Sequence, residues 1–168
     1  MAGPVDIRGT SNGAADATQA VLVAVPGLSS LPEGEHYTLI GVRSAHPESH
    51  NGTTGLNAAL GALADSLAAY AALIPTMPDS LKPTGRFPNV LAINDMSLPL
   101  GGLFDLDANW TCSAGHCDHR VGTNADIDVR RGAEDDDYAR YVQLIWQVKL
   151  GHELGDERTD HNHYHLRF

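Results

Sequence analysis

Histidine and aspartate residues recur at alternate positions in two segments of this sequence. His163 and His165 flank Tyr164 near the last residue, and Asp126 and Asp128 are spaced in the same way. In an extended strand alternate side chains project from one face, so each pair lies on one face of its strand. If the two strands are neighbours, a carboxylate and two imidazoles converge.

A third imidazole can join them from the loop that precedes Asp126, where His119 lies. Two histidines and one aspartate that leave a fourth position for water form a catalytic zinc site, whereas a structural zinc site is more often closed by four ligands rich in cysteine. The competing interpretation is a solvated, tag-like histidine-rich terminus, since a His-x-His pair alone is weak evidence for a metal. These residues therefore predict zinc binding only in combination.

Short motifs follow one another in a defined order along the chain. Residues 94–97 read Asn-Asp-Met-Ser, residues 101–102 read Gly-Gly, residues 116–127 have the form His-x-x-His-x-x-Gly-x-x-x-Asp-Ile, and residues 163–167 read His-Tyr-His-Leu-Arg. This order resembles the LAS group of zinc metallopeptidases, which includes D-Ala-D-Ala carboxypeptidases and dipeptidases and the zinc domain of hedgehog proteins. Within the group it is closest to the penicillin-insensitive murein endopeptidase family, and the likeness covers roughly residues 50–168.

This resemblance implies that His119, Asp126 and His165 hold Zn²⁺. It also implies that His163 lies beside the metal-bound water, as its general base or as a hydrogen-bond donor to the transition state. Zinc lowers the pKa of a bound water towards about 7, and an ordinary imidazole with a pKa of about 6.5 can then manage the proton.

The identity of the base is less closely specified. Carboxypeptidase-type relatives carry a glutamate three residues before the last histidine, where this sequence has Asn162. The remaining candidates are Asp160, His161 and His163, of which we rank His163 first. Asp160 is either a second candidate for the base or a group that orients a ligand.

Three further side chains have both a functional and a structural interpretation. His116 either contacts the substrate or a ligand, or packs within its loop. Asp128 either accepts a hydrogen bond from a ligand imidazole or is a solvated strand residue. Arg120 either binds a substrate carboxylate or is a surface arginine.

Cys112 and Cys117 lie close together in sequence beside the expected ligand His119. They form either a disulfide or part of a second metal site. Two cysteines cannot complete a structural zinc site by themselves, which favours the disulfide and an oxidising compartment.

The apolar patterns predict the elements that carry these residues. We expect strands over residues 20–25, 36–42, 90–93, 126–129 and 163–168, the first and the third of them buried. Residues 1–18 are expected to form a flexible leader or linker, and residues 19–168 a zinc metallopeptidase-like domain. Residues 97–122 are expected to be a long loop.

Two helices complete the prediction. The first has a cap at Thr53 or Thr54 and ends before Pro75, with Leu56, Leu60, Leu63, Leu67 and Tyr70 along one face. The second begins at acidic residues 134–137 and stops at Gly151, with Tyr138, Tyr141, Val142, Ile145 and Val148 along one face. The fold class is therefore α+β: a small, mainly antiparallel sheet with two principal helices, which the resemblance narrows to the hedgehog/D-Ala-D-Ala-peptidase type.

Composition limits the partners. The 168 residues suit one domain, and the formal net charge of −10 disfavours binding to nucleic acid or to anionic membranes. Residues 56–74 are apolar but are interrupted by Asp65 and Ser66, so we expect no membrane insertion. Residues 1–4 have neither the basic start nor the apolar region of a signal peptide, so we expect that export would depend on a signal outside this sequence. The oligomeric state is not predicted.

The function expected is that of a zinc metallopeptidase of murein endopeptidase or carboxypeptidase type, acting on peptide or peptidoglycan in the periplasm or outside the cell. The alternative is a catalytically inactive, hedgehog-like zinc-binding or adhesion module of a larger surface protein. Metal binding is common to both, and turnover separates them.

Overall fold

A computed structural model describes residues 3–10, 12, 16–41, 48–102, 117–129, 136–155 and 163–168, with the backbone alone of Cys117 and Asp136. The strands are β1 (Gly3–Gly9), β2 (Ala17–Val23), β3 (Leu28–Ser30), β4 (Tyr37–Leu39), β5 (Asn51–Thr53), β6 (Leu91–Ile93), β7 (Asn124–Asp128), β8 (Glu153–Leu154) and β9 (His163–Arg167). The helices are α1 (Thr54–Leu73) and α2 (Asp136–Leu144), with short turns η1 (Ile74–Thr76), η2 (Asp79–Leu81), η3 (Cys117–Val121) and η4 (Ile145–Lys149).

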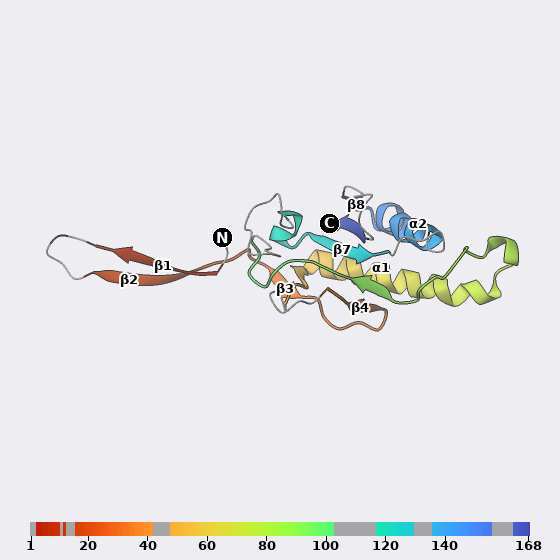
Figure 1. Cartoon of the computed structure of the whole chain (residues 1–168), viewed down its shortest axis with the longest axis horizontal. Coiled ribbons are helices and arrows are strands. Elements are labelled where there is room, and N and C mark those ends of the chain that lie inside the picture. The colour runs from red at the N-terminus through yellow and green to blue at the C-terminus, as the bar shows by residue number, and fades with distance from the viewer. Residues whose placement is uncertain are drawn as a thin grey trace.

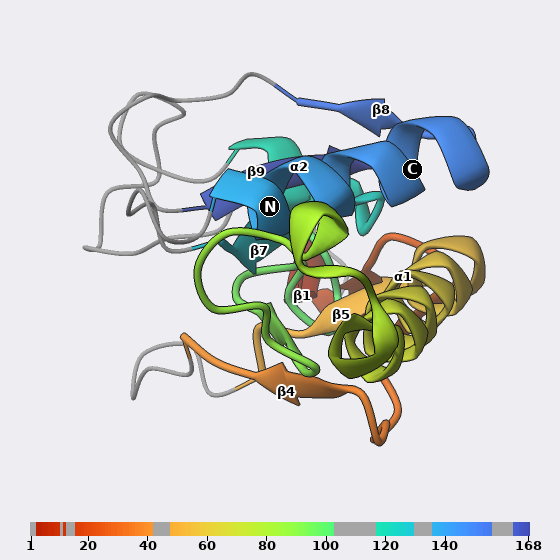
Figure 2. The same cartoon turned by 90° about the vertical axis from the view of Figure 1, so that its right-hand side faces the viewer.

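A five-stranded sheet in the order β4-β6-β7-β9-β8 forms the centre of the protein (Figure 2). The pair β4–β6 is parallel, and the other three pairs are antiparallel. β3 and β5 form a separate antiparallel pair. The α+β class with two helices and small, mostly antiparallel sheets is thus confirmed, with one parallel pair that was not expected.

Helix α1 begins and ends close to where the sequence predicts. The N–H of Leu56 donates to Thr53 Oγ1 over 3.2 Å, which caps the first turn. The expected leucine face is fully buried, at Leu56, Leu60, Leu63 and Leu67. By length and composition alone, the helical stretch from residue 54 to residue 76, with a mean hydropathy of 1.5, could also cross a membrane.

Helix α2 continues into the π-helical turn η4, which ends at Lys149, just before the predicted stop at Gly151. Tyr138, Val142 and Ile145 are buried as predicted, but Val148 is 74% exposed. A π turn rotates the following side chains relative to an α-helix, so Val148 leaves the buried stripe and Trp146 takes its place in the core. Gly151 follows with a φ of 75°, consistent with its predicted role at the end of the helix.

The two central strands separate an apolar face from a polar one. Ile127 of β7 and Leu166 of β9 are fully buried in the same core as the leucines of α1 and Val142 of α2. Both helices therefore cover this face of the sheet. The opposite face carries Asp126 and the alternate residues of β9.

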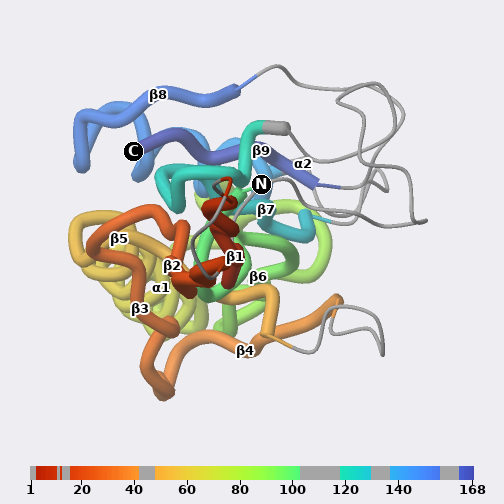
Figure 3. The backbone as a smooth tube through the Cα atoms, turned by 90° about the vertical axis from the view of Figure 1, so that its left-hand side faces the viewer, coloured from red at the N-terminus to blue at the C-terminus, as the bar shows by residue number. Residues whose placement is uncertain are grey.

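The strand predicted over residues 20–25 exists as β2, but the prediction that it is buried is wrong. β2 pairs with β1 in an antiparallel hairpin that projects from the rest of the protein (Figures 1 and 3), and every residue of β2 is exposed. Among the described strands β1 and β2 pair only with each other, and neither contributes a residue to the described hydrophobic core. Regular structure within residues 1–18 was not expected either, whereas the domain boundary at residue 19 stays a prediction.

Candidate metal centre

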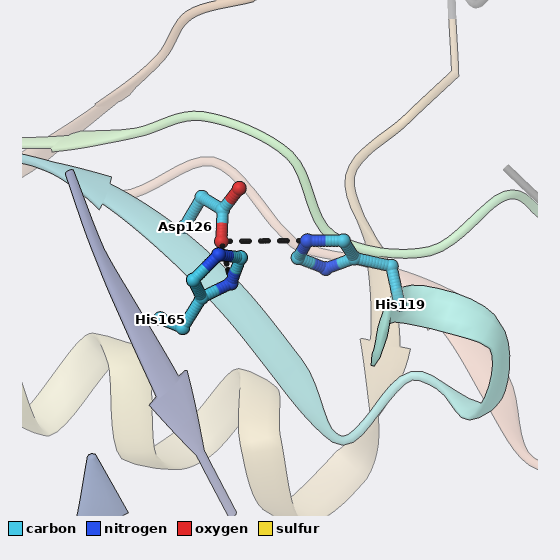
Figure 4. Close-up of side chains that lie close together, drawn as sticks. All are labelled: His119, Asp126 and His165. Atoms are coloured by element: carbon cyan, nitrogen blue, oxygen red, sulfur yellow. Dashed lines mark ion pairs between the residues drawn. The ribbon is translucent and has the colours of Figure 1, made fainter. Parts of the chain in front are cut away.

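Three side chains from different elements meet on the polar face of the central strands. His119 comes from η3, Asp126 from β7 and His165 from β9, and Figure 4 shows the two imidazoles converging on the carboxylate. The register of β7 and β9 places Asp126 directly opposite His165. The two strands are therefore neighbours, which is the condition that the sequence analysis set for these side chains to converge.

The nitrogens of both imidazoles approach one carboxylate oxygen. Asp126 Oδ1 lies 3.3 Å from His119 Nε2 and 2.6 Å from His165 Nδ1. The side chains of His119 and Asp126 are fully buried, while that of His165 is 14% exposed. One ligand atom from each residue lies within 4.8 Å of the others, so this group could hold a metal ion.

Burial and charge act against each other on the titration of this group. Burial lowers the pKa of His119, but the hydrogen bond to Asp126 and its negative charge outweigh burial, so the pKa is raised. Burial raises the pKa of Asp126, but the hydrogen bonds from His119 and His165 outweigh it and hold the pKa well below its usual range. The two imidazoles therefore favour the ionised form of the carboxylate.

The chemistry of the donors fits a divalent cation. His119 Nδ1 lies 3.4 Å from the carbonyl oxygen of Asn124, to which it can donate. In the neutral imidazole this tautomer turns the lone pair of Nε2 towards Asp126, whereas the protonated ring donates to Asp126 from Nε2. Two lone pairs that face each other over 3.3 Å need a proton or a metal between them. Ligands about 2.0–2.2 Å from a tetrahedral zinc are themselves about 3.3–3.5 Å apart. The separation of His119 and Asp126 matches this value, whereas the 2.6 Å between His165 Nδ1 and Asp126 Oδ1 is a hydrogen-bond distance that a bound zinc would have to widen.

His163 lies beside the group and is not one of its three members. His163 lies two residues along β9 from His165, on the same face, and its Nε2 lies 3.6 Å from Asp126 Oδ2. The side chain is 17% exposed, so this imidazole borders both the buried carboxylate and solvent. That is the position in which the sequence analysis expects a base.

Glycines hold the segment that carries His119. Gly122 has a φ of 69°, and a Cβ there would lie 2.2 Å from the side chain of Leu28. Its carbonyl accepts the N–H of Thr53 over 2.8 Å, while the N–H of Gly102 donates to the carbonyl of Arg120 over 2.9 Å. The Gly-Gly and His-x-x-Gly motifs thus place η3 against the rest of the fold.

The loop after β6 brackets the carboxylate from the other side. The N–H of Asp126 donates to the carbonyl of Asp95 over 2.8 Å, and the carbonyl of Asp126 accepts the N–H of Asn94 over 2.7 Å. Asp95 is 4% exposed, and its charge also raises the pKa of His119. The motif Asn-Asp-Met-Ser marked this loop, but reasoning from sequence alone did not place Asp95 beside the site.

The other predicted residues are only partly described. Asp128 lies opposite His163 in the register of β7 and β9, and Arg120 lies in η3 directly after His119. His116, Asp160 and Cys112 lie outside the described residues, as does the side chain of Cys117. The disulfide and the role of Asp160 therefore stay predictions.

No protein-family model matches the chain, and no curated protein matches it either.

Proposed function

We propose that this protein is a zinc-dependent peptidase that hydrolyses amide bonds in the peptide stems or cross-links of bacterial peptidoglycan. The observation that supports this proposal best is the buried meeting of two imidazoles and one carboxylate, with a further imidazole beside them on the solvent side. The resemblance of the motifs adds the class of substrate, and it places the reaction in the periplasm or outside the cell.

In this proposal His119, Asp126 and His165 hold the zinc. Zinc bound there would lower the pKa of a water towards about 7 and polarise the carbonyl of the scissile bond. Asp126 offsets the positive charge of the ion, and its burial excludes competing water from that side. Three protein ligands, all that the described residues bring to this group, match a catalytic zinc site better than a closed structural one.

His163 is the residue that moves the proton. Its imidazole accepts the proton that the attacking water gives up, and donates it to the nitrogen of the departing amine. A ring near Asp126 that also reaches solvent can serve both steps. Asp160 is the second candidate for this role, and His116 and Arg120 are candidates for contacts with the substrate.

The proposal is tested by digesting purified peptidoglycan with the protein, with and without a chelator, and identifying the products by mass spectrometry. We expect cleaved stems or cross-links in the untreated sample, none after chelation, and recovery when zinc is added back. Zinc binding without any product would instead indicate the inactive binding or adhesion module. Absence of both zinc and products would contradict either function.

A further inference from the structure

The hairpin of β1 and β2 has an apolar face that the described part of the chain leaves uncovered. The register pairs Val5 with Val21, so that Val5, Ile7, Val21 and Val23 share one face. The exposed fractions are 57% for Ile7, 37% for Val21 and 42% for Val23. Asp6 and Arg8 alternate with these residues and lie on the other face, which also carries Leu22.

The outer edge of β1 is also open. Among the described strands β1 pairs with β2 alone, so its second edge has no strand beside it. A two-stranded hairpin by itself is at best marginally stable in water, and three or more strands with an apolar face are needed for independent stability. An open edge of this kind is a template for a strand of another chain.

We propose that the outer edge of β1 pairs antiparallel with β1 of a second copy of this chain, about a two-fold axis at Ile7. In this register Ile7 faces Ile7 of the second copy, and Asp6 faces Arg8 of the second copy in two symmetric pairs. The result is a four-stranded sheet with a continuous apolar face. Opposite charges directly across a sheet stabilise it, whereas like charges destabilise it.

Neighbouring registers are less favourable. A shift that places the axis at Asp6 brings two aspartates together, and one that places it at Arg8 brings two arginines together. A shift by a single residue turns the apolar face of one hairpin to the polar face of the other. The order Asp6-Ile7-Arg8 thus selects one register.

The geometry of the hairpin suits this pairing. Pro4 has no N–H to donate and lies opposite Thr10 of the second copy, so the paired segment runs from Val5 to Gly9. Because the hairpin projects from the body (Figure 1), an antiparallel pair places the two bodies at opposite ends. This separation limits the repulsion between two chains of formal net charge −10.

The test is sedimentation equilibrium of the full chain at an ionic strength of about 0.15 M, where charge repulsion between the bodies is screened beyond about 8 Å. Concentrations run from micromolar to millimolar, because so short a strand pair is smaller than a standard interface. We expect a reversible monomer–dimer equilibrium. A chain that remains monomeric over the whole range would overturn the proposal.

Two charge variants test the register. Asp6→Lys places a lysine opposite Arg8, and Arg8→Glu places a glutamate opposite Asp6, so each variant alone should dimerise about tenfold more weakly. An equimolar mixture of the two variants should recover the wild-type affinity, because both charge pairs are then opposite in sign. Ala17→Lys, on β2 opposite Gly9 and away from Asp6 and Arg8, is the control and should dimerise as the wild type does.

Arg8 also forms an ion pair with Asp16 across the hairpin, so Arg8→Glu alone could disturb the hairpin itself. Recovery in the mixture distinguishes the two causes, because a disordered hairpin would not regain affinity on mixing. A dimer that is insensitive to both substitutions, or a mixture that does not recover, would overturn the proposed contact.

Discussion

Asp126 is the residue on which the rest of the metal centre depends. Its carboxylate is fully buried, and nitrogens of three imidazoles lie within 3.6 Å of its oxygens. A buried charge that loses its partner costs about 3–5 kcal/mol of folding free energy. The histidines therefore stabilise the buried carboxylate as well as sharing the metal group with it. The same carboxylate accounts for the raised pKa of His119 against the effect of burial.

The two histidines of β9 should differ in what they do. His165→Ala should reduce bound zinc from about one ion per chain to near zero, because it removes a ligand. His163→Ala should retain most of the zinc and lower the hydrolysis of peptidoglycan by about 10²-fold or more, because it removes the base. Elemental analysis and product analysis on the same samples measure both effects.

His36→Ala is the matched control for this pair, since His36 is half-buried and lies outside the metal group. It should leave both zinc and activity unchanged. If His163→Ala and His165→Ala lost zinc equally, His163 would be a ligand and the base would have to be sought elsewhere, with Asp160 first.

At the scale of elements, the position of η3 decides where His119 lies. Gly122→Ala should destabilise the fold by about 1–2 kcal/mol for its left-handed backbone. A further cost of about 1–3 kcal/mol is expected because the new Cβ would overlap Leu28. It should also weaken zinc binding, because η3 must move.

Gly151→Ala separates these effects, since Gly151 has a similar φ of 75° but open space around it. This variant should show the cost of the backbone alone and bind zinc like the wild type. Thermal unfolding and titration with a competing chelator measure the two quantities. Equal zinc affinity in the wild type, Gly122→Ala and Gly151→Ala would show that Gly122 does not position His119.

Helix α2 is tied to the loop after η2 by one carboxylate. Asp137 Oδ2 accepts the N–H of Thr84 over 2.6 Å and its hydroxyl over 2.7 Å, and these bonds lower the pKa of Asp137. A lowered pKa means that the stabilisation is present above the ordinary aspartate pKa of about 3.9. It is lost as the pH falls through the lowered value in the folded protein.

Asp137→Ala should therefore lower the Tm at neutral pH, and the difference from the wild type should shrink under acid conditions. Asp79→Ala is the control, because its carboxylate is 95% exposed and pairs with Lys82 at the surface. It should change the Tm little at any pH. A difference for Asp137→Ala that persists unchanged into strong acid would contradict the assignment.

At the scale of the whole molecule, sequence patterns within one element correctly predicted which face of that element is buried. Alternation fixed which face of β9 carries His163 and His165, and the leucine spacing fixed the buried face of α1. Both predictions depend only on the period of one element. The same reasoning correctly brought Asp126 and His165 together once the two strands paired.

What sequence could not supply depends on contacts between distant segments. The apolar run of β2 has the composition of a core strand, and only the lack of a described element against it makes it exposed. β3, β5 and β8 have three residues or fewer, too short to show a period. The parallel pair β4–β6 joins segments on either side of α1, which no local pattern encodes.

The division between the hairpin of β1 and β2 and the rest of the chain leads to a last prediction. Among the described strands those of the hairpin pair only with each other. After the hairpin, the N–H of Val25 donates to the carbonyl of Leu100 over 2.9 Å. A chain of residues 24–168 should therefore keep the Tm and the zinc content of the full protein, and should be monomeric.

A chain of residues 19–168, cut at the boundary predicted from sequence, would retain most of β2 without β1. It should be more prone to aggregate, because it leaves an unpaired apolar strand. Thermal unfolding, elemental analysis and light scattering compare the three chains. Loss of zinc or a large fall in Tm for residues 24–168 would show that the hairpin belongs to the fold that builds the metal centre.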